Sequence, residues 1–281
     1  MMQDALTLSR SQIQAFLTCK RQFELRYLRQ VPWPDRPLPE RVATAVSRGR
    51  QFHQLLERHF LGLPIDAHTL DDDKLRHWWH DFRNSGLEIP NGHFGAVQHK
   101  RYLPEHRLTI PAGNHFLLGR FDLLVVGTHD DLPFAHVFDW KTSHPRSAAD
   151  LYADWQTRLY LAMLAEGGDA LLPNNRSLKP ENIAITYWYV REPDQPRTIF
   201  YDQAKHKDNW ADIVQILGAI DDHTARDEWP LSDSWEPCKG CSYQVYCGRQ
   251  TKHASTPDIA ADDLEVDFVG WSEEAVVPEI P

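Results

Sequence analysis

The chain of 281 residues is 42% hydrophobic and 25% charged, a globular composition that can bury one main core with helical additions. Its longest apolar stretches, such as residues 121–126, are far shorter than the roughly 20 residues that a membrane span requires. The N-terminus lacks the apolar centre of a secretory signal. These features argue against a membrane partner, and we expect a cytoplasmic location.

The net charge of −10 argues against a nucleic-acid partner, because phosphates repel an acidic surface. The charge is unevenly distributed, however. Residues 255–281 contain eight acidic residues and no basic residue, so the remainder has a net charge of −2. Residues 19–58 contain nine basic and four acidic residues. This local excess of positive charge could hold DNA beside a cleft, although solvated helix faces would give the same pattern.

The N-terminal part of the chain has helical periodicity. Apolar residues at helical spacing predict a first pair of helices, and Cys19 lies between or within them. After a Pro-rich break, a longer helix that carries His53 is predicted at residues 41–60. Residues 65–95 suit a helical insert. Within the insert, we expect three consecutive residues to pack inward: His77, Trp78 and Trp79.

The middle of the chain changes to a β pattern. Residues of β-branched and aromatic type, separated by Pro, Gly and Asp, predict strands at 106–110, 115–126 and 134–140. Further elements follow: a helix at 150–165, a buried strand at 183–190 and a last helix at 203–220. This order indicates an α/β (α+β) fold, in which a central mixed sheet with a crossover helix is flanked by helices.

Two carboxylates occupy neighbouring predicted strands. Asp122 lies near the middle of one strand, and Asp139 ends the next, followed by Trp140 and Lys141. Such carboxylates can converge on one divalent cation, which prefers oxygen ligands and can contact a phosphate at the same time. The ammonium of Lys141 could then orient the nucleophilic water or stabilise charge on the phosphate oxygens. Taken alone, the pattern is weak, and surface salt bridges would also explain it.

The chain contains four motifs in this order: Gly49-x-x-x-His53, Gly119-Arg120-Phe121-Asp122, Asp139-Trp140-Lys141 and Gln156-x-x-x-Tyr160. They resemble the RecB-like branch of the PD-(D/E)XK nuclease superfamily, which includes bacterial recombination nuclease domains and CRISPR-associated exonucleases. The resemblance extends from Leu8 to about Cys247. It implies a restriction-endonuclease-like core in a single nuclease domain at residues 1–253, which includes the insert at 65–95. An acidic, flexible tail is expected at residues 254–281.

The resemblance also implies a site for Mg²⁺ or Mn²⁺. It assigns catalysis to Asp122, Asp139 and Lys141, and it implies four metal ligands: His53, Asp122, Asp139 and the carbonyl of Trp140. An imidazole ligand favours Mn²⁺ over Mg²⁺. The alternative for His53 is a helix histidine that only caps or packs.

Three further residues have roles in this resemblance. Gln156 and Tyr160 are one helical turn apart and share a helix face. They are expected to line the cleft, with Gln156 bonding near the metal or the lysine and Tyr160 holding a backbone phosphate. Polar packing in the core is the alternative for both. Glu105 matches another acidic position of such nucleases, but its register relative to the strands stays open.

The four cysteines are Cys19, Cys238, Cys241 and Cys247. Three of them lie within ten residues, which suits a metal or a cluster better than a secreted disulfide framework. Thiolates bind both Zn²⁺ and a [4Fe–4S] cluster. A zinc ribbon usually has two CxxC pairs, whereas one distant cysteine followed by C-x2-C-x5-C resembles the cluster-bearing members of the same branch. We therefore expect a structural [4Fe–4S] cluster that clamps the two ends of the domain together.

These expectations together predict a metal-dependent DNA nuclease. The resemblance implies an exonuclease that acts on single-stranded or end-containing DNA in repair, recombination or CRISPR adaptation, with partner proteins from those processes. Two alternatives stay open. One is a non-catalytic DNA-binding or partner-binding module with the same fold, against which the intact Asp122, Asp139 and Lys141 argue. The other is an RNA-processing nuclease.

Overall fold

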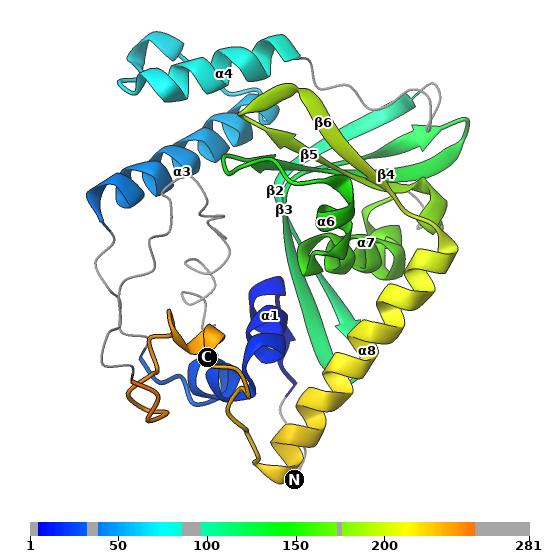
Figure 1. The fold of residues 1–281 in the computed structure, drawn as a ribbon. Coiled ribbons are helices and arrows are strands. Elements are labelled where there is room, and N and C mark those ends of the chain that lie inside the picture. The colour runs from blue at the N-terminus through cyan, green and yellow to red at the C-terminus, as the bar shows by residue number, and fades with distance from the viewer. Residues whose placement is uncertain (1–4, 33–38, 86–96, 173–175, 251–281) are drawn as a thin grey trace, which may run out of the picture.

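The computed structural model describes residues 5–32, 39–85, 97–172 and 176–250, and Figure 1 shows how their helices and strands are arranged. The expected tail at residues 254–281 lies outside these ranges, as do residues 86–95 of the insert. Among the described residues, no helix combines the length and the apolar character that crossing a bilayer requires.

A mixed sheet forms the centre of the fold. Its strands are β1 (Thr7–Leu8), β2 (Val97–Ala112), β3 (His115–His129), β4 (Leu132–Lys141), β5 (Ile183–Tyr189) and β6 (Glu192–Phe200). They lie in the order β1-β3-β4-β5-β6, and β2 also pairs with β3. Strand β1 is parallel to β3 and β4 is parallel to β5, whereas the other pairs are antiparallel. The predicted fold class, a central mixed sheet flanked by helices, is confirmed.

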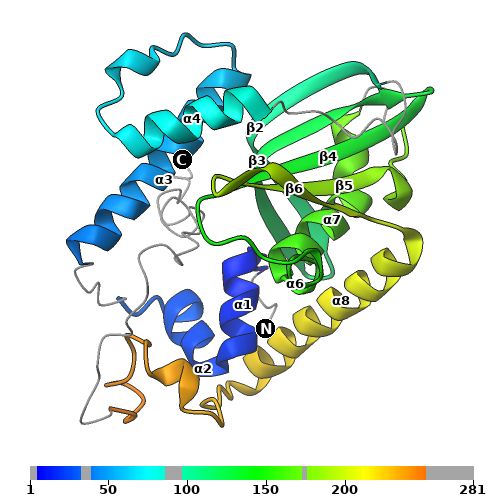
Figure 2. The same cartoon turned by 45° about the horizontal axis from the view of Figure 1, so that its top comes forward.

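Helices cover both faces of the sheet (Figures 1 and 2). One face packs against α1 (Arg10–Thr18), α6 (Ala148–Ala153), α7 (Trp155–Gly167) and α8 (Gln203–Arg226), and the other packs against α3 (Glu40–Phe60) and α4 (Asp73–Ser85). Consecutive side chains of a strand point to opposite faces. Leu123 therefore belongs to the core beneath α3 and α4, and Leu124 to the core beneath α7.

Two strands were not predicted from the sequence. Strand β1 is too short for any periodicity to be visible. Strand β6 contains Pro193, Pro196 and several charged residues, which depress strand propensity. It lies at the edge of the sheet, where a missing N–H can face solvent and prolines are tolerated.

The prediction of a single helix at residues 150–165 is wrong in one respect, because the structure has two helices there. Asp154 separates them with an extended backbone (φ −70°, ψ 138°), and its side chain accepts a hydrogen bond from the backbone N–H of Gln156. Asp154 is thus the N-cap of α7. The last helix continues six residues beyond the predicted end and stops before Asp227, whose backbone is left-handed (φ 51°).

The insert contains helix α4 and a short 3₁₀ helix at Ala67–Thr69. Trp79 is buried in the core beneath α3, and Trp78 is partly buried. The expectation for His77 is wrong, since its side chain is 73% exposed. Three consecutive residues of a helix span about 200° of its circumference at 3.6 residues per turn, so they cannot all face one core.

The two ends of the described chain lie side by side. Helix α1 is followed by α2 (Lys20–Phe23) and a π-helical turn at Glu24–Leu28. In both views of the ribbon, the segment after α8 returns to these elements (Figures 1 and 2). The hydroxyl of Tyr243 donates a hydrogen bond of 2.7 Å to the carbonyl of Val31. This return brings the C-terminal cysteines next to Cys19.

Candidate active site

The paired strands β3 and β4 bring two carboxylates together. Leu123 pairs with Phe138 at one end of the antiparallel ladder. Asp122 on β3 and Asp139 on β4 are the residues next to this pair. Oδ2 of Asp122 accepts a hydrogen bond of 2.9 Å from the backbone N–H of Trp140. The strands are apolar on both faces around this point, and Asp139 is only 2% exposed. Two carboxylates in such surroundings require a cationic partner.

His53 and Glu105 complete an acidic group around Asp122. His53 projects from α3, with its Nδ1 3.5 Å from Oδ2 of Asp122 and its Nε2 3.1 Å from the carbonyl oxygen of Trp140. Glu105 comes from β2. One ligand atom from each of His53, Glu105 and Asp122 lies within 4.8 Å of the others. Oxygen and imidazole ligands at this separation could bind one divalent ion.

The role of Glu105 was left open by the sequence, because its predicted strand began one residue later. In the structure, β2 includes Glu105, with a left-handed backbone (φ 49°). Pro104 pairs with Leu123, and His106 pairs with Phe121. This register of β2 and β3 sets Glu105 opposite Asp122. The sequence feature that could have predicted this register is the Gly113-Asn114 pair, which favours a hairpin turn. Ala112 pairs with His115 across this turn, and counting back along both strands reaches Glu105 and Asp122.

Lys141 and Gln156 surround the second carboxylate. Nζ of Lys141 lies 3.0 Å from Oδ1 of Asp139 and donates a hydrogen bond of 3.0 Å to Oε1 of Gln156. Nε2 of Gln156 donates one of 2.6 Å to Oδ2 of Asp139. Gln156 stands in the first turn of α7, where Asp154 caps the helix and Arg146 binds Asp154 at 2.8 Å. Gln156 thus holds the lysine and the carboxylate in one orientation.

Tyr160 lies one turn further along α7 and is 3% exposed. Its hydroxyl donates a hydrogen bond of 2.6 Å to the carbonyl of Arg120, and its ring packs edge-on against Phe121. Gly119 permits this close approach of α7, because a Cβ there would lie 3.4 Å from the Tyr160 ring and 3.3 Å from Sδ of Met163. These contacts hold β3 in place, and a contact of Tyr160 with phosphate stays a prediction.

Burial shifts the pKa values of the carboxylates in the site, even though His53, Arg120 and Lys141 lie close to them. Burial and the adjacent Asp122 raise the pKa of Glu105 to about 7. Burial raises the pKa of Asp139 to about 6, even though Lys141 opposes this shift. Burial would also raise the pKa of Asp122, but His53 outweighs it and holds that pKa below its usual range. A bound cation would favour the ionised form of all three carboxylates.

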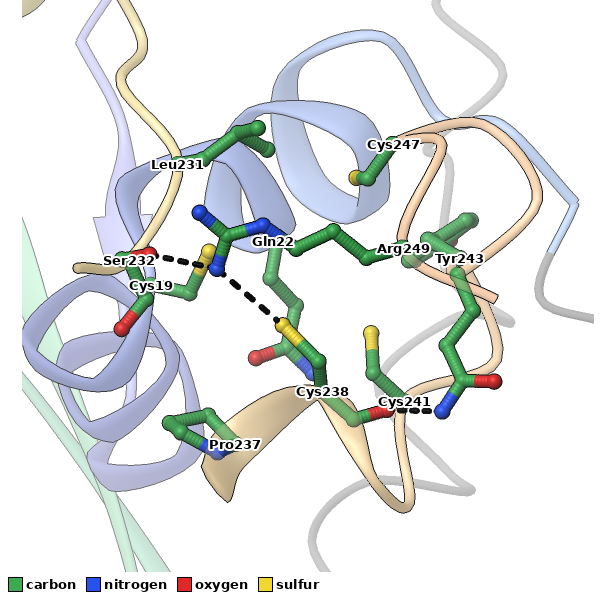
Figure 3. Close-up of a pocket in the computed structure, with 11 residues that line it drawn as sticks. Cys19, Gln22, Leu231, Ser232, Pro237, Cys238, Cys241, Tyr243, Cys247 and Arg249 are labelled. Atoms are coloured by element: carbon green, nitrogen blue, oxygen red, sulfur yellow. Dashed lines mark hydrogen bonds between the residues drawn. The ribbon is translucent and has the colours of Figure 1, made fainter. Parts of the chain in front are cut away.

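The four cysteines meet around one pocket, away from the carboxylates. Cys19 links α1 to α2 with an extended backbone, and Cys238, Cys241 and Cys247 come from the segment after α8 (Figure 3). All four cysteine side chains are half-buried. Burial, and then the neighbouring Cys241 and Cys19, raise the pKa of Cys247. Thiols from both ends of the chain therefore influence one another electrostatically.

Two solved structures are similar to the chain over most of its length. A proposed exonuclease from Eubacterium rectale has a TM-score of 0.46 and 10% sequence identity, and the match covers 98% of this chain and 90% of that chain. A structure named SSO0001 has a TM-score of 0.36 and 14% identity, with coverage of 89% and 90%. No curated protein matches the chain.

A sequence model of one family matches residues 7–248. This range includes both the carboxylate group and the four cysteines, and it covers the described strands and helices from β1 onward. The family is described as the PD-(D/E)XK nuclease superfamily. The match spans far more than half of the 281 residues. The chain therefore belongs to the PD-(D/E)XK nuclease superfamily.

Proposed function

We propose that this chain is a divalent-metal-dependent deoxyribonuclease with Asp122, Asp139 and Lys141 as its catalytic residues. One observation carries the proposal. The ligand atoms of His53, Glu105 and Asp122 lie within 4.8 Å of one another, and the Lys141 ammonium lies 3.0 Å from Asp139 beside them. A metal-ligating acidic group next to a fixed ammonium suits the hydrolysis of a phosphodiester.

The donor set fits Mg²⁺ or Mn²⁺. Asp122, Asp139 and the Trp140 carbonyl offer hard oxygen ligands, His53 offers an imidazole, and Glu105 adds a further carboxylate. Burial raises the pKa values of Glu105 and Asp139, and a bound cation would favour the ionised forms of both carboxylates. When bound, the ion would supply Lewis-acid stabilisation of charge on the scissile phosphate.

The residues around the metal ligands have separate tasks in the proposal. The ammonium of Lys141 lies beside Asp139, where it could orient a water molecule or a phosphate oxygen. Gln156 keeps Lys141 from turning away, because it binds Lys141 and Asp139 at once. His53 lies between Asp122 and the Trp140 carbonyl, where its imidazole could bind the same ion.

The substrate and the process rest on the resemblance to the RecB-like branch. We propose an exonuclease of single-stranded or end-containing DNA that works in the cytoplasm with partners from repair, recombination or CRISPR adaptation. The order of the motifs around His53, Asp122, Lys141 and Gln156 supports this assignment. We also propose one nuclease domain at residues 1–253, which the family match at residues 7–248 supports.

Several basic residues of the N-terminal part form ion pairs within the protein. Arg21 and Arg29 bind the buried carboxylate of Glu24 at 2.5 Å and 2.6 Å. Arg48 binds Asp72 at 2.6 Å. Part of the positive charge that residues 19–58 contain is therefore neutralised by ion pairs within the fold.

A nuclease assay tests the proposal directly. End-labelled single-stranded DNA, duplex DNA and RNA of the same sequence are incubated with the protein, with and without Mn²⁺. We expect metal-dependent release of labelled nucleotides from DNA, and none from the Asp139→Asn variant. Binding without cleavage would favour the non-catalytic alternative. Faster cleavage of RNA would favour an RNA-processing nuclease, and internal fragments would replace the exonuclease assignment by an endonuclease.

Replacing His53 by Ala should reduce Mn²⁺-supported cleavage more than Mg²⁺-supported cleavage, because a nitrogen ligand adds more affinity to the softer ion. The measurement is the cleavage rate as a function of the concentration of each metal. His77→Ala is the control, since His77 is an exposed histidine on α4. Equal losses with both metals would assign His53 a positioning role instead.

We also propose a [4Fe–4S] cluster held by Cys19, Cys238, Cys241 and Cys247. The donor set fits, because four thiols from both ends of the domain line one pocket. Burial, and then the neighbouring Cys241 and Cys19, raise the pKa of Cys247 there. A cationic centre would relieve this effect. The spacing of one distant cysteine and C-x2-C-x5-C supports a cluster over zinc. Bound there, the cluster would fasten α1 and α2 to the C-terminal segment.

Cys19→Ser should release both the cluster and the clamp. Protein purified without oxygen is expected to be brown and to contain iron and sulfide, whereas the variant should lose this colour and unfold at a lower temperature. The measurements are iron and sulfide content, visible absorbance and thermal unfolding. Thr18→Ser, a change next to Cys19 but outside the thiolate set, is the control. A colourless wild-type protein with bound zinc, or a variant with full iron content, would contradict the assignment.

A further inference from the structure

Arg249 reaches into the cysteine pocket. Figure 3 shows its guanidinium among the thiols, between Cys19 and Cys238. Nη1 of Arg249 donates a hydrogen bond of 3.6 Å to Sγ of Cys238. The side chain starts just after Cys247, where Gly248 adopts a left-handed backbone (φ 63°) that only glycine takes without strain. That turn allows Arg249 to follow Cys247 and still point toward Cys238.

Other contacts fix the guanidinium in this orientation. Nη1 of Arg249 also donates to the carbonyls of Ser232, at 2.5 Å, and Ser234, at 3.3 Å. The guanidinium lies 5.0 Å from the centre of the Trp235 ring, within the range of a cation–π contact. The backbone N–H of Arg249 donates a hydrogen bond of 3.0 Å to the carbonyl of Gln244. Arg249 is therefore held at the thiol pocket by both its backbone and its side chain.

We propose that Arg249 is a positioning residue for the cluster, a role that rests on the cluster proposed above. It donates a charge-assisted hydrogen bond to the Cys238 thiolate and stabilises the reduced form, which carries one more electron and one more negative charge. Hydrogen bonds to cluster sulfurs and nearby charge are two of the factors that set the reduction potential. Arg249 thereby raises this potential.

An arginine suits this role better than a lysine. Its planar guanidinium has five N–H donors and can contact the Ser232 carbonyl and the Cys238 sulfur together. Lys239 offers a matched comparison, because it follows Cys238 in the sequence but pairs with Glu236 at 2.5 Å, and its side chain is 64% exposed. Both residues carry one positive charge on the same segment, and only Arg249 donates to a thiol of the pocket among the described hydrogen bonds.

The test is an anaerobic redox titration of the full chain, in which an electrode or dithionite supplies the electron and visible absorbance reports the cluster. At the midpoint potential of the wild-type protein, R249Q is expected to have about a tenfold lower ratio of reduced to oxidised cluster, a shift of about 59 mV to lower potential for one electron. R249K should shift less, because it keeps the charge. K239Q should match the wild type.

Iron content is measured on every sample, because it distinguishes a failure of the cluster proposal from a failure of the role of Arg249. Wild-type protein without iron and sulfide would overturn the cluster and the role of Arg249 together. Full iron content in R249Q with a potential equal to that of K239Q would overturn the role of Arg249 alone. If R249Q loses its iron, the midpoint potential of R249K is the test. A potential below that of the wild-type protein supports the proposal, and a potential equal to it contradicts the proposal.

Discussion

Asp139→Asn and Asp122→Asn are each expected to abolish cleavage while leaving the fold and much of the DNA affinity intact. The amide keeps the size of the carboxylate but removes the charge that would hold the metal. Metal ions supply several kcal/mol of transition-state stabilisation, so the expected loss of rate is about 10³-fold or more. The measurement is the metal-stimulated cleavage rate, together with DNA binding in the presence of Ca²⁺.

Controls are needed because Asp139 also has structural partners. It accepts a hydrogen bond from Gln156 and pairs with Lys141. Thermal unfolding of each variant shows whether the fold survives. Asp73→Asn neutralises a carboxylate that is 89% exposed on α4 and should cleave as the wild type does. Metal-stimulated turnover that survives in either active-site variant would place the active site elsewhere.

Lys141→Ala should slow cleavage by about 10²- to 10⁴-fold, the range typical of groups that assist proton transfer or position a reactant. The reason is that Lys141 provides the fixed ammonium next to Asp139, while the carboxylates that would bind the metal stay in place. Single-turnover rates at saturating metal measure this effect without a contribution from metal affinity. Lys207→Ala, an exposed lysine on α8, is the control.

The outcome for Lys141 also tests the role of Gln156. If Gln156 acts by holding Lys141, Gln156→Ala should lower the rate in the wild-type background and add little in the Lys141→Ala background, since residues that act through each other are not additive. A wild-type rate in Lys141→Ala would leave Lys141 with no role beyond its ion pair with Asp139. Fully additive losses would instead assign Gln156 an effect of its own on Asp139.

The local pattern of the chain predicted the strands and helices that carry the site. Strand β5 is buried throughout, β4 is buried except at its ends, and β3 alternates in its first half and is buried at residues 123–127. Their apolar and β-branched residues therefore predict them without tertiary information. The helix that carries His53 was predicted to within one residue at its start. Strand β6 was missed for the opposite reason, because an edge strand tolerates the prolines that local propensity counts against it.

The sequence by itself determined the chemical types and the spacing of Asp122, Asp139, Lys141 and the four cysteines, since side-chain chemistry and distance along the chain are local properties. Only the tertiary structure decided which residues share a site. Glu105 meets His53 because a hairpin sets the register of β2, and Arg249 meets Cys238 because a left-handed turn at Gly248 redirects the chain. Such contacts depend on strand register and backbone direction, which are properties of the folded chain and have no counterpart in local periodicity.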